Sequence, residues 1–146
     1  TEVERATRRA TEIGVVLQAR NLFDHLSVEE HLRFQMHLAR RFNKSRLEQL
    51  LTLVGLSNHR TAHPAQLSGG EAARAALAVA LAPDPKVLLA DEPTGEVDSE
   101  TEQQILSLFG LYRQQGGALL LATHSDAVAA QADRVLHLQD GRMSDV

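Results

Sequence analysis

The chain has 146 residues, of which 43% are hydrophobic, and its formal net charge is −4. This length and composition suit one globular domain with a buried core, and the charge provides no basic field for nucleic acid. Cysteine is absent, which excludes disulfides, thiolate metal sites and thiol catalysis. No apolar run is long enough to span a bilayer, and the first residues lack the apolar core of a signal peptide. We therefore expect a soluble, cytoplasmic domain.

An apolar, β-branched run near the start of the chain predicts a buried strand at residues 13–17. Residues 1–12 mix acidic and basic residues with alanine, and they predict a short helix or an ordered tail. Gln18 directly follows the predicted strand. Open parallel sheets place ligand-contacting groups at the carboxyl ends of their strands, so Gln18 is a candidate site residue. The alternative is a polar residue that only marks the exit from a strand.

The next part of the chain predicts helices. Two S-x-x-E capping boxes begin at Ser27 and at Ser45, and each predicts a helix start. Gly55 is a good C-terminal stop for the second of these helices. Between residues 24 and 82 no segment has the pattern of a strand, and we predict a helical insert or subdomain there.

A turn of small residues precedes the next helix. Ser68 can cap this helix with Glu71 as its reciprocal partner, and Gly69 and Gly70 lie in the first turn. One interpretation is a plain helix start whose glycines permit tight packing. The other is an anion site, because the missing Cβ atoms let a phosphate approach free backbone amides at the positive end of the helix dipole. These residues alone leave both interpretations open.

From residue 83 onward strands alternate with helices, which predicts a parallel α/β sheet. A helix that is capped at Ser99 and stopped near Gly116 joins the first two of these strands. A short helix near residues 126–131 and a closing turn at Asp140-Gly141 complete the pattern. The predicted strands are residues 87–90, 118–123 and 134–139.

Two adjacent carboxylates follow the strand at residues 87–90. Asp91 can hold Mg²⁺ directly or through water, and Glu92 can orient and deprotonate a water aimed at a γ-phosphate. His124, after the neighbouring strand, can hydrogen-bond a transferring phosphoryl group or its attacking water. The alternatives are a solvated acidic turn and a strand-end histidine satisfied by the backbone, and Asp98 is by default a helix-start residue. Parallel packing predicts that the two strand ends lie side by side.

The order of these motifs resembles that of the ATP-binding-cassette (ABC) ATPases over nearly the whole chain. Residues 67–71, with the sequence LSGGE, are similar to the highly specific signature of this family. The resemblance implies that Ser68, Gly69 and Gly70 contact the γ-phosphate of ATP held by a partner subunit, with Glu71 as a further cofactor-binding candidate. It also implies an α/β fold, in which a partial P-loop-NTPase-type parallel sheet carries an inserted α-helical signature subdomain.

The remaining motifs resemble the hydrolytic residues of the same family. Asp91 is similar to the Walker B aspartate, which implies Mg²⁺ binding, and Glu92 to the catalytic base. Gln18 is similar to the Q-loop glutamine, which contacts Mg²⁺ or the attacking water and couples to the permease. His124 resembles the switch histidine, which implies a catalytic role. Asp98 resembles the D-loop aspartate, which makes it a cofactor-binding candidate.

The front of the family pattern is missing from these residues. Neither Lys44 nor Lys86 lies in a Gly-Lys-Ser/Thr motif, so the 146 residues contain no P-loop. In the family, the Walker A loop and the leading strands precede the position of residue 1, so we expect an N-terminally truncated subunit. Alone it should bind ATP weakly and be inactive, and exposed sheet edges should make it self-associate. The predicted parts are ATPase core with the Q-loop (1–23), helical signature subdomain (24–82) and C-terminal ATPase core (83–146).

The predicted function is that of a fragment of an ABC transporter ATPase subunit. It would pair with a second ATPase subunit and couple ATP hydrolysis to transport through transmembrane permease subunits, on the cytoplasmic face of the cell membrane. Residues 89–95 resemble the branch of lipoprotein release, macrolide export and cell division. Glu96-Val97 replaces its usual Asn-Leu, and Ala72-Ala73 its usual Gln-Gln or Arg-Gln. The alternatives are a soluble ABC ATPase of DNA repair or translation, and a non-catalytic module that docks a permease.

Overall fold

Three parallel strands form the central sheet of the protein. In the computed structural model, which describes residues 1–19 and 21–145, the strand order is β1-β2-β3. Both pairings are parallel, and β2 is the central strand. This confirms the predicted parallel α/β class, but the strand predicted at residues 134–139 is not part of this sheet, because it pairs with a later strand in an antiparallel hairpin. The strands are β1 (Ile13–Val16), β2 (Val87–Asp91) and β3 (Ala118–Ala122).

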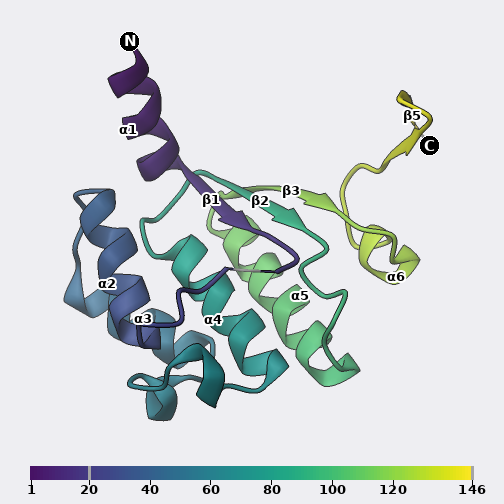
Figure 1. Ribbon diagram of the computed structural model, residues 1–146. Coiled ribbons are helices and arrows are strands. Elements are labelled where there is room, and N and C mark those ends of the chain that lie inside the picture. The colour runs from purple at the N-terminus through teal and green to yellow at the C-terminus, as the bar shows by residue number, and fades with distance from the viewer. Residues whose placement is uncertain (20, 146) are drawn as a thin grey trace.

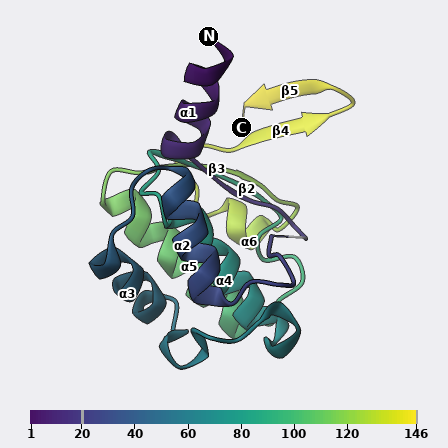
Figure 2. The ribbon, with the colours of Figure 1, turned by 60° about the vertical axis from the view of Figure 1, so that its left-hand side comes forward.

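The four long helices that follow β1 lie on one side of this sheet, as both views of the ribbon show (Figures 1 and 2). Helices α4 and α5 lie against the strands, and α2 and α3 extend the layer away from them (Figure 1). Residues 24–82 contain no strand, as the sequence predicts. The helices are α2 (Val28–Leu38), α3 (Lys44–Leu53), α4 (Gly69–Leu81) and α5 (Ser99–Gln114).

The alanine-rich helix α4 is the centre of the hydrophobic core. Small side chains along α4 allow close contact with its neighbours, and Leu77 and Leu81 of this helix are both buried. At Gly14 in β1, an added Cβ would lie 2.5 Å from the carbonyl oxygen of Ala80. The sheet and α4 therefore meet at backbone distance, which only glycine permits at this position.

Two arginines join the helical half to the ends of other elements. The Arg46 guanidinium donates from Nη2 to the carbonyl oxygen of Leu81 at 2.6 Å, at the end of α4. Arg41 donates from Nη1 to the carbonyl oxygen of Thr11 at 2.9 Å, near the end of the first helix. Both guanidiniums therefore satisfy carbonyl groups that the helix itself leaves without a partner.

Several smaller elements lie outside this core. Helix α1 (Glu2–Glu12) buries no residue and projects away from the sheet (Figure 1). Strands β4 (Leu136–Gln139) and β5 (Arg142–Asp145) form an antiparallel hairpin, which Figure 2 shows standing apart from the main sheet. Its turn uses positive φ angles at Asp140 and Gly141, as predicted for this dipeptide. The others are η1 (Ser57–His59), η2 (Pro64–Gln66) and α6 (Asp126–Ala129).

The structure corrects the predicted starts of two helices. Helix α3 is capped by Asn43, whose Oδ1 accepts from the Arg46 N–H at 3.0 Å, and Ser45 lies inside the helix. Helix α5 is capped by Asp98 and begins at Ser99. In both cases an earlier side chain with extended backbone reaches the free N–H groups first. The predicted ends near Gly55 and Gly116 are confirmed, and both glycines have positive φ.

The face of the sheet opposite the helices is apolar and open. Val15, Leu89 and Leu120 are paired in register across the three strands, and 49% of Val15 and 65% of Leu120 are exposed. Parallel sheets normally have both faces covered. Asp91 lies two residues after Leu89 and shares this face, because side chains alternate along a strand.

In the part of the chain that the structure describes, none of the helices has the length and apolar character of a membrane span.

The open face predicts self-association of the 146-residue chain, and Leu120→Lys should weaken it about tenfold or more. A charged side chain in a desolvated contact loses its hydration, which opposes burial of this face. Sedimentation velocity over a range of concentrations measures the association. Leu111→Lys, the same change at an exposed position of α5, is the matched control and should have little effect. A wild-type chain that stays monomeric, or equal effects of both changes, would contradict the prediction.

Candidate functional site

The parallel pairing of β2 and β3 brings their carboxyl ends together. Asp91 is paired with Ala122, and the Glu92 N–H donates to the carbonyl oxygen of Ala122 at 2.9 Å. Glu92 has a φ of 44°, which is uncommon for a residue with a side chain. Such left-handed residues concentrate at functional sites, where surrounding contacts hold them. Here the turn is closed by the Gly95 N–H, which donates to the Glu92 carbonyl oxygen at 3.1 Å.

Glu92 and His124 are in direct contact. The Oε1 atom of Glu92 accepts from the His124 backbone N–H at 2.9 Å and lies 2.7 Å from the imidazole Nδ1. Thr123 donates from Oγ1 to Oε2 of the same carboxylate at 3.4 Å. The carboxylate is 19% exposed and the imidazole 82% exposed, so the acid is sheltered and the imidazole faces solvent. The predicted side-by-side position of the two strand ends is therefore confirmed, and the contact between the two side chains is a finding of the structure.

Asp91 is exposed at the carboxyl end of β2, on the open face of the sheet. The described residues contain no group of three or more ligating side chains that could hold a metal ion by themselves. Mg²⁺ commonly keeps several waters and takes one or two carboxylates together with phosphate oxygens of a substrate. A lone exposed carboxylate beside a second acid therefore fits a magnesium ion that is shared with a phosphate ligand.

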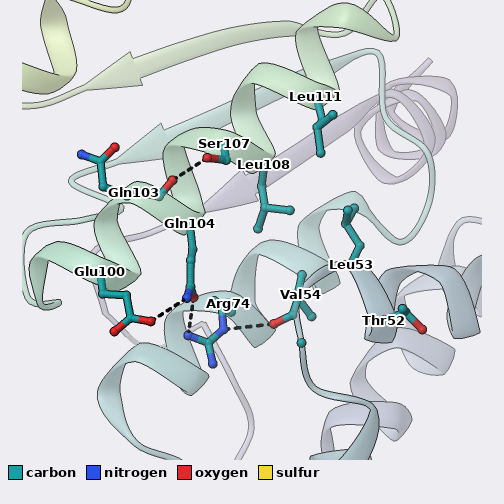
Figure 3. A pocket seen from close by; sticks show the side chains of 11 residues that line it. Thr52, Leu53, Val54, Arg74, Glu100, Gln103, Gln104, Ser107, Leu108 and Leu111 are labelled. Carbon is teal, nitrogen blue, oxygen red and sulfur yellow. Dashed lines mark hydrogen bonds between the residues drawn. The ribbon is translucent and has the colours of Figure 1, made fainter.

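One cleft of about 310 Å³ brings together segments that are far apart in the sequence. Gln18, Gly69 and Glu92 all line this cleft, so the loop after β1, the start of α4 and the loop after β2 all border it. Gln18 lies two residues beyond the end of β1, because this strand ends at Val16, one residue earlier than predicted. A larger open groove of about 810 Å³, between the end of α3 and helix α5, contains none of the predicted site residues (Figure 3).

The turn at residues 68–70 is a full capping box. Ser68 accepts at Oγ from the Glu71 N–H at 3.2 Å, and Glu71 accepts at Oε2 from the Ser68 N–H at 2.7 Å. This backbone hydrogen bond is the main reason why the pKa of Glu71 lies below its ordinary value. An added Cβ at Gly69 would meet open space, whereas at Gly70 it would meet Thr101. Tight packing therefore explains Gly70, and contact with a phosphate stays a prediction.

Asp98 has the structural role that its position predicts by default. It caps α5 by accepting at Oδ1 from the Thr101 N–H at 2.8 Å. This hydrogen bond is the main cause that lowers the pKa of the Asp98 carboxyl. A role of Asp98 toward a nucleotide stays a prediction.

The sequence does not predict the roles of two residues, Asn21 and His31, in the segments that follow β1. Asn21 closes the loop after β1, because its Oδ1 accepts from the Leu17 N–H at 2.7 Å and its Nδ2 donates to the Leu17 carbonyl oxygen at 2.6 Å. The imidazole of His31 is buried and makes two contacts. Its Nε2 accepts from the Phe23 N–H at 2.7 Å, and its Nδ1 lies 2.7 Å from the carbonyl oxygen of Ser27. The Phe23 N–H needs an acceptor, which assigns a neutral ring with its proton on Nδ1. The only sequence signal was a histidine among the apolar positions of α2.

Comparison with known proteins defines the class that this fold and site belong to. Residues 1–95 match the family model described as "ABC transporter", and the chain belongs to this family. It is 41% identical over 145 residues to the lipoprotein-releasing system ATP-binding protein LolD of Acinetobacter baylyi, covering 96% of this chain and 64% of LolD. It is 44% identical over 144 residues to the methionine import ATP-binding protein MetN of Caulobacter vibrioides, covering 95% of this chain and 43% of MetN.

The fold is also that of a solved ATP-binding cassette. MJ0796, whose dimeric post-hydrolysis state was solved with bound ADP and Pi, aligns with a TM-score of 0.87 and 31% identity. The alignment covers 99% of this chain and 67% of that one. The chain spans about three fifths of the length of the first curated relatives that it matches. The resemblance inferred from the LSGGE, Asp91-Glu92 and His124 motifs is thereby confirmed at the level of the family.

Stability should depend on pH through His31. Burial is the main cause that lowers the pKa of this imidazole, and its own-helix neighbour Glu30 and the imidazoles of His25 and His63 also face it. The unfolded chain takes up this proton near pH 6.5, whereas the folded chain does so only at lower pH. Stability is therefore present above pH 6.5 and is lost as the pH falls below it.

His31→Asn should remove this part of the pH dependence. Urea unfolding at pH 7.5 and pH 5.5 measures the free energy of unfolding, which should fall less in the variant than in the wild-type chain between these two values. His137→Asn, at an exposed position of β4, is the matched control and should keep the wild-type profile. The prediction is wrong if His31→Asn and wild type lose the same stability over this range.

Proposed function

We propose that this chain provides the signature and the hydrolytic residues of a transport ATPase subunit. The observation that carries the proposal is the contact of Glu92 with His124 at the joined ends of β2 and β3. The cleft that Gln18 and Glu92 both line supports it, because the proposed magnesium ligand and the proposed base then border one space. In the complete subunit, the reaction is the hydrolysis of ATP to ADP and phosphate, and this drives transport through a membrane permease.

Each residue has a role that its chemistry supports. Glu92 orients a water and takes its proton. The hydrogen bonds from Thr123 and His124 fix the carboxylate but do not use all the lone pairs of its two oxygens, so it can still accept from a water. His124 is exposed and donates from Nδ1 to this carboxylate, so its Nε2 can accept from the attacking water or, as an imidazolium, donate toward the transferring phosphoryl group. Asp91, with Gln18, would hold Mg²⁺, which when bound would neutralise charge that develops on the phosphate oxygens.

Glu92 would act on ATP bound by the same complete subunit, whereas Ser68, Gly69 and Gly70 would contact a different ATP, held by a second subunit. Ser68, Gly69 and Gly70 present the first turn of α4, whose free amides and dipole favour an anion. Open space at the Cα of Gly69 supports close approach of a phosphate there. Glu71 stabilises this turn through its capping box, and Asp98 starts the helix beside it. The MJ0796 cassette was solved as a dimer with ADP and Pi, which supports this arrangement.

An apolar patch on the helical half is the surface that we assign to the permease. Phe23, Phe34 and Leu38 are each about half exposed, and the rings of Phe23 and Phe34 meet edge to face at 6.1 Å between centroids. Exposed aromatic side chains close to one another are typical of protein contacts. Phe23 follows the Gln18 loop and is held by His31, so the patch adjoins the site. This contact would place the subunit on the cytoplasmic face of the cell membrane.

Glu92→Gln in the full-length subunit should lower steady-state ATP hydrolysis at least about 100-fold, because the amide cannot accept the proton of the attacking water. ATP-induced dimerisation should persist, since the amide keeps the shape of the side chain. Phosphate release and light scattering measure the two effects. Glu102→Gln, the same chemical change on α5, is the control and should retain turnover. Unchanged turnover in Glu92→Gln would contradict the role that we assign to Glu92.

A further inference from the structure

Helices α4 and α5 touch at their first turns. A Cβ added to Gly70 would lie 2.6 Å from Oγ1 and 3.2 Å from Cγ2 of Thr101. At a separation below 3.0 Å one of the two groups has to shift, so the contact as it stands depends on the missing Cβ of Gly70. By contrast, Gly69 in the same turn and Gly110 farther along α5 meet open space. The requirement for glycine is therefore specific to the position that faces Thr101.

Thr101 also holds the side chain that starts α5. It is 5% exposed, and its Oγ1 donates to Oδ2 of Asp98 at 3.3 Å while its N–H donates to Oδ1 at 2.8 Å. One buried side chain thus contacts Gly70 on one side and Asp98 on the other. The Asp98 cap lies within the start of α5 and can form without α4, so the contact of Thr101 with Gly70 is an additional link between the two helices.

A second contact one turn farther along fixes the same pair of helices (Figure 3). Arg74 donates from Nη1 to Oε1 of Gln104 at 2.9 Å and from Nε to the carbonyl oxygen of Val54 at 3.0 Å. Arg74 follows Gly70 by four positions and Gln104 follows Thr101 by three, so each pair lies on one helix face. Two contacts at successive turns set both the distance and the rotation of α4 against α5.

We propose that Thr101 is a positioning residue that joins the starts of α4 and α5, so that the 68–70 turn and Asp98 form one rigid unit. The functional meaning rests on the proposed function, in which the 68–70 turn contacts ATP held by the partner subunit and Asp98 is a cofactor-binding candidate. A misplacement of about 1 Å in such a site can lower the rate about 100-fold. The contacts of Thr101 with Gly70 and Asp98 hold the two turns at one spacing.

A double-mutant cycle on the 146-residue chain tests the contact without nucleotide. Gly70→Ala should lower Tm by about 4 °C, although glycine to alanine in a helix normally stabilises. In the Thr101→Ala background most of this loss should vanish, because the nearest remaining side-chain atom, Cβ, lies at 3.4 Å. Gly110→Ala is the matched control and should not lower Tm. Additive effects of Gly70→Ala and Thr101→Ala would overturn the contact.

Amide NMR then tests whether Thr101 transmits a change at Asp98 to the 68–70 turn or only stabilises the fold. In the wild-type background, Asp98→Asn should change the amide chemical shifts of Gly69 and Gly70. The same substitution should leave these chemical shifts unchanged in the Thr101→Ala background and change them again in the Thr101→Ser background. The Gly110 amide should not move in any variant. Equal shifts with and without the Thr101 side chain would overturn the proposal. Neither measurement requires ATP turnover, so a complete subunit that failed to hydrolyse ATP would count against the proposed function alone.

Discussion

Parallel pairing of β2 with β3 is the interaction on which the site depends. It sets Asp91 opposite Ala122, and this register delivers the Glu92 carboxylate to the backbone and ring of His124. A slip of one residue would turn the side chains of a strand to the opposite face and separate the two groups. The close approach of α4 to β1 at Gly14 then brings the loop with Gln18 and the start of α4 to the same edge. The site is therefore a consequence of sheet register and backbone-distance packing.

A second constraint is the one-sided cover of the sheet. The helical layer buries one face, while Val15 and Leu120 remain exposed on the other. Asp91, the candidate magnesium ligand, lies on this open face. Any further element that covered this face of the sheet would therefore lie next to Asp91. The roles that we propose for these residues are a magnesium ligand, a base and an anion-binding helix start. The sequence contains no Gly-Lys-Ser/Thr loop that would hold a triphosphate.

Local patterns made the fold predictable, and contacts between distant segments limited the rest. Apolar runs bounded by Pro83 and Gly116-Gly117 located strands β2 and β3, and the strand-end rule brought Glu92 to His124. The caps at Ser45 and Ser99 were wrong because Asn43 and Asp98, equally good caps, come first. The contacts of His31 with Phe23 and of Thr101 with Gly70 join separate segments, and no local spacing reports them. For the same reason the sequence could not choose between the two interpretations of the 68–70 turn.

Our central proposal is that residues 1–146 provide the hydrolytic residues of an ATPase subunit and need a triphosphate-binding segment to act. The most direct test fuses the part of LolD that lies outside the matched region to this chain and measures Mg²⁺-dependent ATP hydrolysis. We expect turnover in the fusion that Glu92→Gln abolishes, while the 146-residue chain alone shows none. A folded fusion that binds ATP without hydrolysing it, or turnover that survives Glu92→Gln, would contradict this claim.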